Sequence, residues 1–241
     1  MCRDCVWAGP ASAGGDGRAD SGRFGRKDAN KPYPAAIVRA AQNKAFEQEQ
    51  EQLPSLRALA FAAVAAEGQT GPLVEGGAEG DESPGTHMTL YEHPRRGPEP
   101  SPLARAWWAT FVGSGCLDRV TAQVWEFLRA RKSPVALFPK FPHRVFFHLY
   151  AAEPGDATGC PAASATRGDG MTDHYDIVPH CAVTVCLTGD GAARGLYWCR
   201  QGARHHLHLD AGDIAIIARG VLHGVERVAR KEARLVLVLF Y

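Results

Sequence analysis

Two histidines and an aspartate in the C-terminal half have the residue types and the spacing that metal chemistry requires. His174 and Asp176 are separated by one residue, and His223 follows much later in the chain. On a β-strand, side chains two residues apart point to the same face. Two imidazoles and one carboxylate on one side of an ion leave positions open opposite, and this donor set suits Fe(II). The spacing predicts a metal centre with His174, Asp176 and His223 as its ligands and catalytic residues.

An arginine downstream of the second histidine could bind a carboxylate. Arg234 opens an apolar stretch in which Val236 and Val238 would share its face of a strand. A charged residue on an apolar inward face is costly unless it is paired, and the planar guanidinium matches the geometry of a carboxylate. We therefore expect Arg234 to bind a carboxylate co-substrate. The alternative is an exposed arginine at the start of a strand.

The elements that must position these residues are short strands. From residue 135 onward, apolar residues alternate with polar ones, and turn residues recur every few positions, as in an antiparallel sheet that is closed or sandwiched. Helices precede the strands and do not alternate with them, which disfavours a doubly wound parallel fold. We expect a mainly β jelly roll with strands at about 144–150, 174–176, 182–188, 195–200, 204–209, 214–218, 221–228 and 234–241.

Helices are expected before the strands. Residues 103–132 carry apolar residues at helical spacing and a break at 113–115. The aromatic residues Trp107, Trp108 and Phe111 in this stretch are interpreted as packing on the sheet, not as a cofactor site.

The N-terminal third has a different composition. Residues 1–33 are rich in Gly, Ala, Asp and Arg and are expected to be disordered. Residues 34–66 are typical of a helix interrupted near Pro54, and 68–85 of a linker. We therefore predict a disordered or helical extension over 1–86, followed by a catalytic domain over 87–241 whose helices lie near 103–132 and whose jelly-roll core is 135–241.

Overall composition limits the class of protein. The net charge of +1 gives no support to a nucleic-acid partner, because proteins that bind nucleic acids often carry a basic excess. Seven scattered cysteines do not resemble a secreted disulfide framework, and Cys2 and Cys5 form a lone pair with no second pair in the chain. No apolar run is long enough to span a membrane. We expect a cytoplasmic or nuclear protein in a reducing compartment.

Five short motifs together resemble the double-stranded β-helix of the 2-oxoglutarate/Fe(II)-dependent dioxygenases over roughly residues 144–241. Their order and spacing are similar to those of the prolyl hydroxylase branch, and the stretch from His223 to Phe240 has some similarity to the TET/JBP group. The motifs are His174-Tyr-Asp176, Gly195-Leu-Tyr197, Ala211-Gly-Asp-Ile214, Leu222-His-Gly-Val225 and Arg234-Leu-Val-Leu237.

The resemblance implies an oxygenase that oxidises a C–H bond and releases succinate and carbon dioxide. It implies Fe(II) and 2-oxoglutarate as cofactors, with ascorbate as a further candidate, and iron ligation by His174, Asp176 and His223. It implies that Arg234 binds the distal carboxylate of 2-oxoglutarate and that Tyr150 donates a hydrogen bond to it. The Asn that follows the H-x-D motif in DNA-modifying relatives is absent, so the substrate stays open among a protein side chain, a nucleobase and a small molecule. Nothing indicates a specific protein partner.

Other interpretations remain open at this point. A nucleobase-modifying dioxygenase of TET/JBP type is one. The segments from Gly168 to His174 and from Gly212 to His223 echo the two cupin half-motifs, which would imply a metal protein without 2-oxoglutarate. A degenerate barrel that serves as an interaction module is a third. The cluster His205-His206-x-His208 is interpreted as an exposed group on the outer face, since adjacent residues of a strand point to opposite sides.

Overall fold

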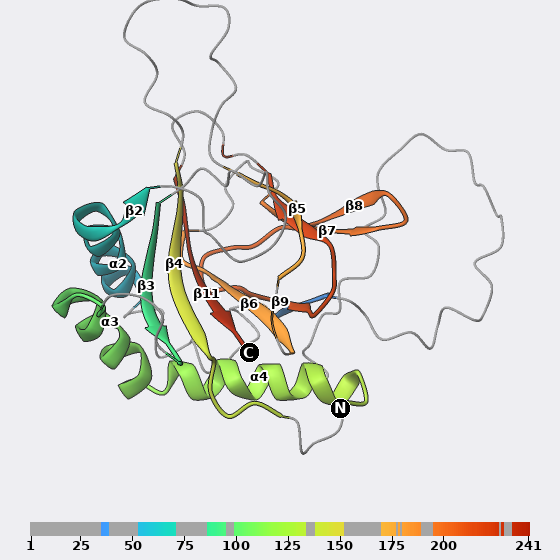
Figure 1. Ribbon diagram of the computed structural model, residues 1–241, viewed down its shortest axis with the longest axis horizontal. Coiled ribbons are helices and arrows are strands. Elements are labelled where there is room, and N and C mark those ends of the chain that lie inside the picture. The colour runs from blue at the N-terminus through green and yellow to red at the C-terminus, as the bar shows by residue number, and fades with distance from the viewer. Residues whose placement is uncertain are drawn as a thin grey trace, which may run out of the picture.

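The protein is built from two β-sheets, with helices covering one face of the larger sheet (Figure 1). This arrangement confirms the predicted mainly β fold. None of the described helices is long and apolar enough to cross a lipid bilayer. The computed structural model describes residues 35–38, 53–70, 86–94, 99–133, 138–151, 170–176, 178, 180–188, 195–226, 228 and 233–241.

The larger sheet has seven strands, and neighbouring strands pair antiparallel throughout. Its centre is the long pair β11 and β4, in register from Ala233 opposite Ala151 to Phe240 opposite Arg144. In spatial order the strands are β1 (Ala35–Val38), β9 (Ile214–Ala218), β6 (Cys181–Cys186), β11 (Ala233–Phe240), β4 (Arg144–Ala151), β3 (Thr86–Glu92) and β2 (Gln69–Thr70).

The smaller sheet has four strands and carries both predicted histidine ligands. The hairpin of β7 and β8 turns at Gln201 and Gly202, which both have positive φ, 52° and 80°, as the sequence signal for a tight turn predicts. The spatial order is β5 (Met171–His174), β10 (His223–Val225), β7 (Leu196–Arg200) and β8 (Ala203–Leu207).

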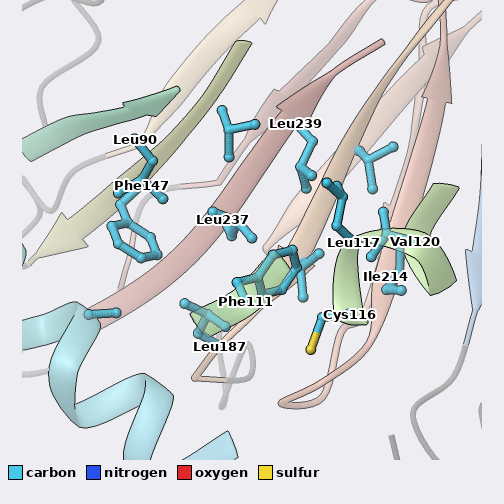
Figure 2. Packing of buried hydrophobic residues seen from close by; sticks show 14 of the residues in the cluster. Leu90, Phe111, Cys116, Leu117, Val120, Phe147, Leu187, Ile214, Leu237 and Leu239 are labelled. Atoms are coloured by element: carbon cyan, nitrogen blue, oxygen red, sulfur yellow. The ribbon is translucent and has the colours of Figure 1, made fainter. Parts of the chain in front are cut away.

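Within the described residues, three helices pack on the face of the larger sheet that is turned away from the smaller one. They are α2 (Leu53–Glu67), α3 (Pro102–Gly113) and α4 (Cys116–Ala130). Figure 2 shows Phe111 of α3 and Val120 of α4 among side chains of the sheet such as Phe147 and Leu237. Burial of this continuous apolar layer supplies the main driving force for folding.

The helices begin and end where the sequence predicts a break. Ser101 caps α3 by accepting a hydrogen bond from the backbone N–H of Ala104, with Pro102 in the first turn. Gly115 separates α3 from α4 in a left-handed conformation, φ 79°. Trp107 is buried against Phe147 and donates its indole N–H to the carbonyl of Leu56 in α2. The interpretation of this aromatic as core is therefore confirmed.

The N-terminal third differs from the sequence expectation in two described segments. Gln69–Thr70, inside the expected linker, is the strand β2, which pairs with β3. The expected helix over 34–66 was wrong at Ala35–Val38, which is the strand β1 paired with β9. Local composition favours a helix there, but hydrogen bonding to the edge of a sheet overrides propensity. Pro54 is the second residue of α2, where proline is tolerated because an N–H there would lack an intrahelical acceptor. The predicted disorder over 1–33, Cys2 and Cys5, and most of the 68–85 linker lie outside the described residues.

Candidate metal centre

His174, Asp176 and His223 lie together at the smaller sheet. One ligand atom from each lies within 4.8 Å of the others. His174 ends β5 and is directly opposite His223 on β10. Asp176 lies two residues past the end of β5, not on it, and its carboxylate turns back between the rings. Its oxygens lie 3.5 Å from Nε2 of His174 and 3.1 Å from Nε2 of His223.

Backbone carbonyls hold both imidazole rings. Nδ1 of His174 lies 2.8 Å from the carbonyl oxygen of Thr172, and Nδ1 of His223 lies 2.9 Å from that of Val221. These contacts assign the ring proton to Nδ1 in each case. Both Nε2 atoms then face the carboxylate of Asp176. Histidines that bind metals are commonly oriented by this kind of hydrogen bond from the other ring nitrogen.

The electrostatics of the group fit a cation. Burial by itself would raise the pKa of Asp176, but the hydrogen bonds and charges of His174 and His223 outweigh it and hold the pKa below its usual range. The carboxylate is therefore ionised at neutral pH in a largely enclosed position. An anionic oxygen and two imidazole nitrogens converge on one point, and this donor set fits Fe(II).

Arg234 lies on the inner face of the larger sheet, which faces the smaller one. Its side chain is only 2 % exposed. The strand pair β11–β4 places it opposite Tyr150, and its guanidinium carbon lies 5.8 Å from the centre of the Tyr150 ring. The inward orientation expected from the alternation of β11 is found, since Val236 belongs to the same buried cluster as Tyr150. The two residues predicted to bind the co-substrate are therefore neighbours.

His148, for which we predicted no role, lies beside them. It is 2 % exposed and stacks on Tyr150 with ring centroids 4.1 Å apart. Burial, together with the charges of His87, Arg234 and His174, lowers its pKa to about 3. His148 therefore lies within electrostatic reach of both Arg234 and His174. Its signal in the sequence was its position two residues before Tyr150 on a predicted strand.

The ring of His148 is unsatisfied. Neither nitrogen has a hydrogen-bond partner among the described residues. A buried polar group without a partner costs about 1–3 kcal/mol, and such groups are rare in native proteins unless a water, ion or ligand satisfies them. His148 is therefore available to a bound molecule on the inner face.

The other histidines of the sequence do not join the metal-ligand group. His205 stacks on Trp198 with centroids 4.3 Å apart, and Nε2 of His206 lies 3.9 Å from a carboxylate oxygen of Glu226. Neither belongs to the group of His174, Asp176 and His223. Both are half-buried, and as adjacent residues of β8 they lie on opposite faces of the sheet, so the expected exposed cluster on the outer face was wrong for them.

Comparison with known proteins supports the fold. No protein-family model and no curated protein sequence matches the chain significantly. An oxidoreductase of the 2OG-Fe(II) oxygenase family from Burkholderia pseudomallei matches with a TM-score of 0.52 at 16% identity, covering 86% of this chain and 84% of that one. A putative oxygenase from Shewanella oneidensis matches with a TM-score of 0.52 at 15% identity, covering 89% and 83%. The non-heme alpha-ketoglutarate-dependent carbocyclase SnoK from nogalamycin biosynthesis matches with a TM-score of 0.52 at 8% identity, covering 86% and 79%. The chain therefore has the double-stranded β-helix fold of the 2-oxoglutarate/Fe(II) oxygenases.

Proposed function

We propose that the chain is an Fe(II)- and 2-oxoglutarate-dependent dioxygenase that oxidises a C–H bond of its substrate and releases succinate and carbon dioxide. One observation carries the proposal: two histidines and an ionised aspartate converge in this fold, close to an inner face that holds a buried arginine. Neither the group of two histidines and an aspartate nor the buried arginine is needed for folding, because apolar residues could replace these buried polar groups.

His174 and His223 would bind the iron through Nε2, and Asp176 would bind it through its carboxylate. Bound iron supplies the reaction between dioxygen and the keto acid. The carbonyls of Thr172 and Val221 keep both rings in the orientation and tautomer that binding requires. Asp176 remains ionised, so no proton has to leave it before the metal binds.

Arg234 would bind the distal carboxylate of 2-oxoglutarate. In a buried site of low dielectric, hydrogen bonds between a guanidinium and a carboxylate are strong, and the planar fork fixes the orientation of the carboxylate. The hydroxyl of Tyr150 would donate a further hydrogen bond to the same molecule. His148 stays neutral because of its low pKa, so it can offer one donor and one acceptor to the co-substrate.

Apolar residues between the two sheets would exclude water from the reaction. Leu196 and Val225 of the smaller sheet and Val236 of the larger sheet are buried in the same cluster as Tyr150. A dry, fixed environment strengthens the polar contacts inside it and limits side reactions of the oxidant. The protein thus contributes binding, orientation and exclusion of water.

The direct test is release of succinate from 2-oxoglutarate by the purified chain with added Fe(II) and dioxygen, since slow turnover without substrate is sufficient for detection. We expect succinate from the wild type and none from His174→Ala. Binding of Fe(II) without any affinity for 2-oxoglutarate, and with no effect of Arg234→Met, would favour the cupin-type alternative. No Fe(II) binding by the folded chain would contradict the proposal.

A further inference from the structure

The outer face of the smaller sheet carries a hydrogen bond that spans three strands. Tyr197 on β7 donates its hydroxyl to Oδ1 of Asp173 on β5, at 2.5 Å. β10 lies between these two strands in the sheet, so the tyrosine reaches across it. Asp173 precedes His174, and the residue that Tyr197 crosses, Gly224, follows His223. The bond therefore ends on the immediate neighbour of one candidate metal ligand, and the tyrosine that makes it passes over the immediate neighbour of the other.

Gly224 makes this crossing possible. A Cβ at this position would lie 2.6 Å from Cζ of Tyr197, closer still to the hydroxyl oxygen, and 2.8 Å from the carbonyl oxygen of Met171. Real Cβ atoms do not approach other heavy atoms so closely. Close approach of another group to the backbone is one of the reasons for glycine in a strand. Only glycine at position 224 therefore leaves room for the Tyr197 side chain above β10.

Arg204 on β8 extends the contact. Its guanidinium donates to Oδ1 of Asp173 at 3.0 Å and to Oε1 of Glu226 at 3.3 Å, and lies 4.4 Å from the centre of the Tyr197 ring. These ion pairs are partly exposed, and such pairs contribute little to stability. Tyr197 is only 2 % exposed, so the buried phenol, not the ion pairs, carries most of the restraint.

The backbone alone holds the two ligand strands loosely. β5 has four residues, β10 has three, and their pairing shifts register between His223 and Val225. A short, irregular ladder leaves the relative position of His174 and His223 under-determined. Metal affinity is sensitive to the groups that orient the ligands, and their loss typically weakens binding about 10–100-fold.

We propose that Tyr197, Asp173 and Gly224 form a clamp that fixes β5 against β10, so that His174 and His223 are held at the spacing the metal requires. These are positioning residues, and their effect on the metal rests on the proposed function. The clamp acts on the smaller sheet from its outer face, without contact between Tyr197 and the ion.

The test compares Tyr197→Phe with Tyr241→Phe. Both changes remove one buried tyrosine hydroxyl, and that of Tyr241 is hydrogen-bonded to Thr121 in the helix-backed layer. Anaerobic titration with Fe(II) alone gives the dissociation constant of the metal, and amide hydrogen exchange of β5 in the metal-free protein reports the clamp directly. We expect Tyr197→Phe to raise the dissociation constant about tenfold and to speed exchange in β5, whereas Tyr241→Phe changes neither.

Two substitutions of Asp173 test whether its hydrogen bond with Tyr197 matters for metal binding. Asp173→Asn keeps an oxygen that can accept from Tyr197, whereas Asp173→Ala removes it, so the metal affinity of the Asn variant should fall between those of the wild type and Ala. Equal β5 exchange in Tyr197→Phe and Tyr241→Phe would overturn the clamp, as would an unchanged Fe(II) dissociation constant. Failure of the wild type to bind Fe(II) would instead overturn the proposed function, and the exchange of β5 would still decide whether the clamp holds the strands.

Discussion

The two faces of the strand pair β4–β11 are both largely buried but differ in their chemistry. The outer face, against the helices, is wholly apolar, with Val145, Phe147, Leu235 and Leu237 at or near zero exposure. The inner face, only one residue away along each strand, carries Tyr150, His148 and Arg234 at 2–3 % exposure. Folding favours the first arrangement and opposes the second, because buried polar groups cost free energy unless they are satisfied.

The contrast separates two tasks within one sheet. The outer face supplies apolar burial for folding, and under the proposed function the inner face, together with the smaller sheet, would bind the metal and the co-substrate. Local conflicts with folding are expected at functional sites. Changes on the two faces should therefore have opposite signatures, one in stability with function retained and the other in function with stability retained.

The largest effect is expected at the metal centre. His223→Ala removes one of three candidate ligands, and metal catalysis contributes several kcal/mol to barrier lowering, so the rate of succinate formation should fall by about 1000-fold or more. The far-UV circular dichroism spectrum should not change. A rate within tenfold of the wild type, measured with saturating Fe(II), would show that His223 is not a ligand.

Phe147→Ala tests the outer face. Phe147 is fully buried and makes an edge contact with Trp107 at 4.6 Å between ring centroids. Its truncation should lower the free energy of unfolding by about 3–5 kcal/mol, measured by urea denaturation. The molecules that remain folded should bind Fe(II) as tightly as the wild type. A change in metal affinity without loss of stability would break the division between the faces.

Arg234→Met tests the inner face. Loss of a buried partner for a carboxylate costs about 2–5 kcal/mol of binding, so the dissociation constant of 2-oxoglutarate should rise about 30-fold or more. Stability should stay the same or increase, because an apolar residue replaces a buried charge. Calorimetric titration of the metal-loaded protein measures the dissociation constant of 2-oxoglutarate, and urea denaturation measures the free energy of unfolding.

Arg129→Met is the matched control for this prediction, since Arg129 is half exposed on α4. It should leave 2-oxoglutarate binding unchanged. Equal affinities of the wild type and Arg234→Met would remove Arg234 from the co-substrate site.

The smallest effect, taken over one pH unit, is a dependence of the free energy of unfolding on pH. Burial lowers the pKa of His148 in the folded protein to about 3, whereas the unfolded chain keeps an ordinary value of 6.5. Between these values the unfolded state binds the additional proton, so the free energy of unfolding falls as the pH drops from about 6.5 toward 3 and is unaffected by this group above 6.5. The loss is at most about 1.4 kcal/mol per pH unit.

His148→Phe should lack this part of the loss. Urea denaturation of the metal-free protein at a series of pH values gives the difference in the free energy of unfolding between wild type and variant. We expect the difference to grow in favour of the variant as the pH decreases below about 6.5. If the free energies of unfolding of the wild type and the variant fell in parallel as the pH decreased, His148 would not stay neutral in the folded protein.

Much of the framework could be predicted from the sequence because its signals are local. Alternation of apolar residues in β4 and β11 predicts the strands and places Arg234 on the inner face with Val236. The jelly roll and the break between α3 and α4 follow from turn residues and periodicity. The strand β1 could not be predicted, because Ala35–Val38 is decided by pairing with β9, far away in the sequence.

The candidate site could likewise be predicted from the sequence only in part. His174, Asp176 and His223 could be grouped from residue types and a family resemblance, but the position of Asp176 beyond the end of β5 required the structure. The isolation of His148 depends on what surrounds it, not on any motif. The bond between Tyr197 and Asp173 crosses an intervening strand, and no spacing along the chain encodes it.

Anaerobic titration with Fe(II) and then 2-oxoglutarate, followed by visible absorption, tests the central claim most directly. A 2-oxoglutarate chelate of Fe(II) gives a weak charge-transfer band. We predict that the band appears and saturates with the wild type, is absent with His223→Ala, and requires a higher 2-oxoglutarate concentration with Arg234→Met. A folded wild-type protein that gives no band at saturating concentrations of both would contradict the assignment of this inner face to an Fe(II)/2-oxoglutarate site.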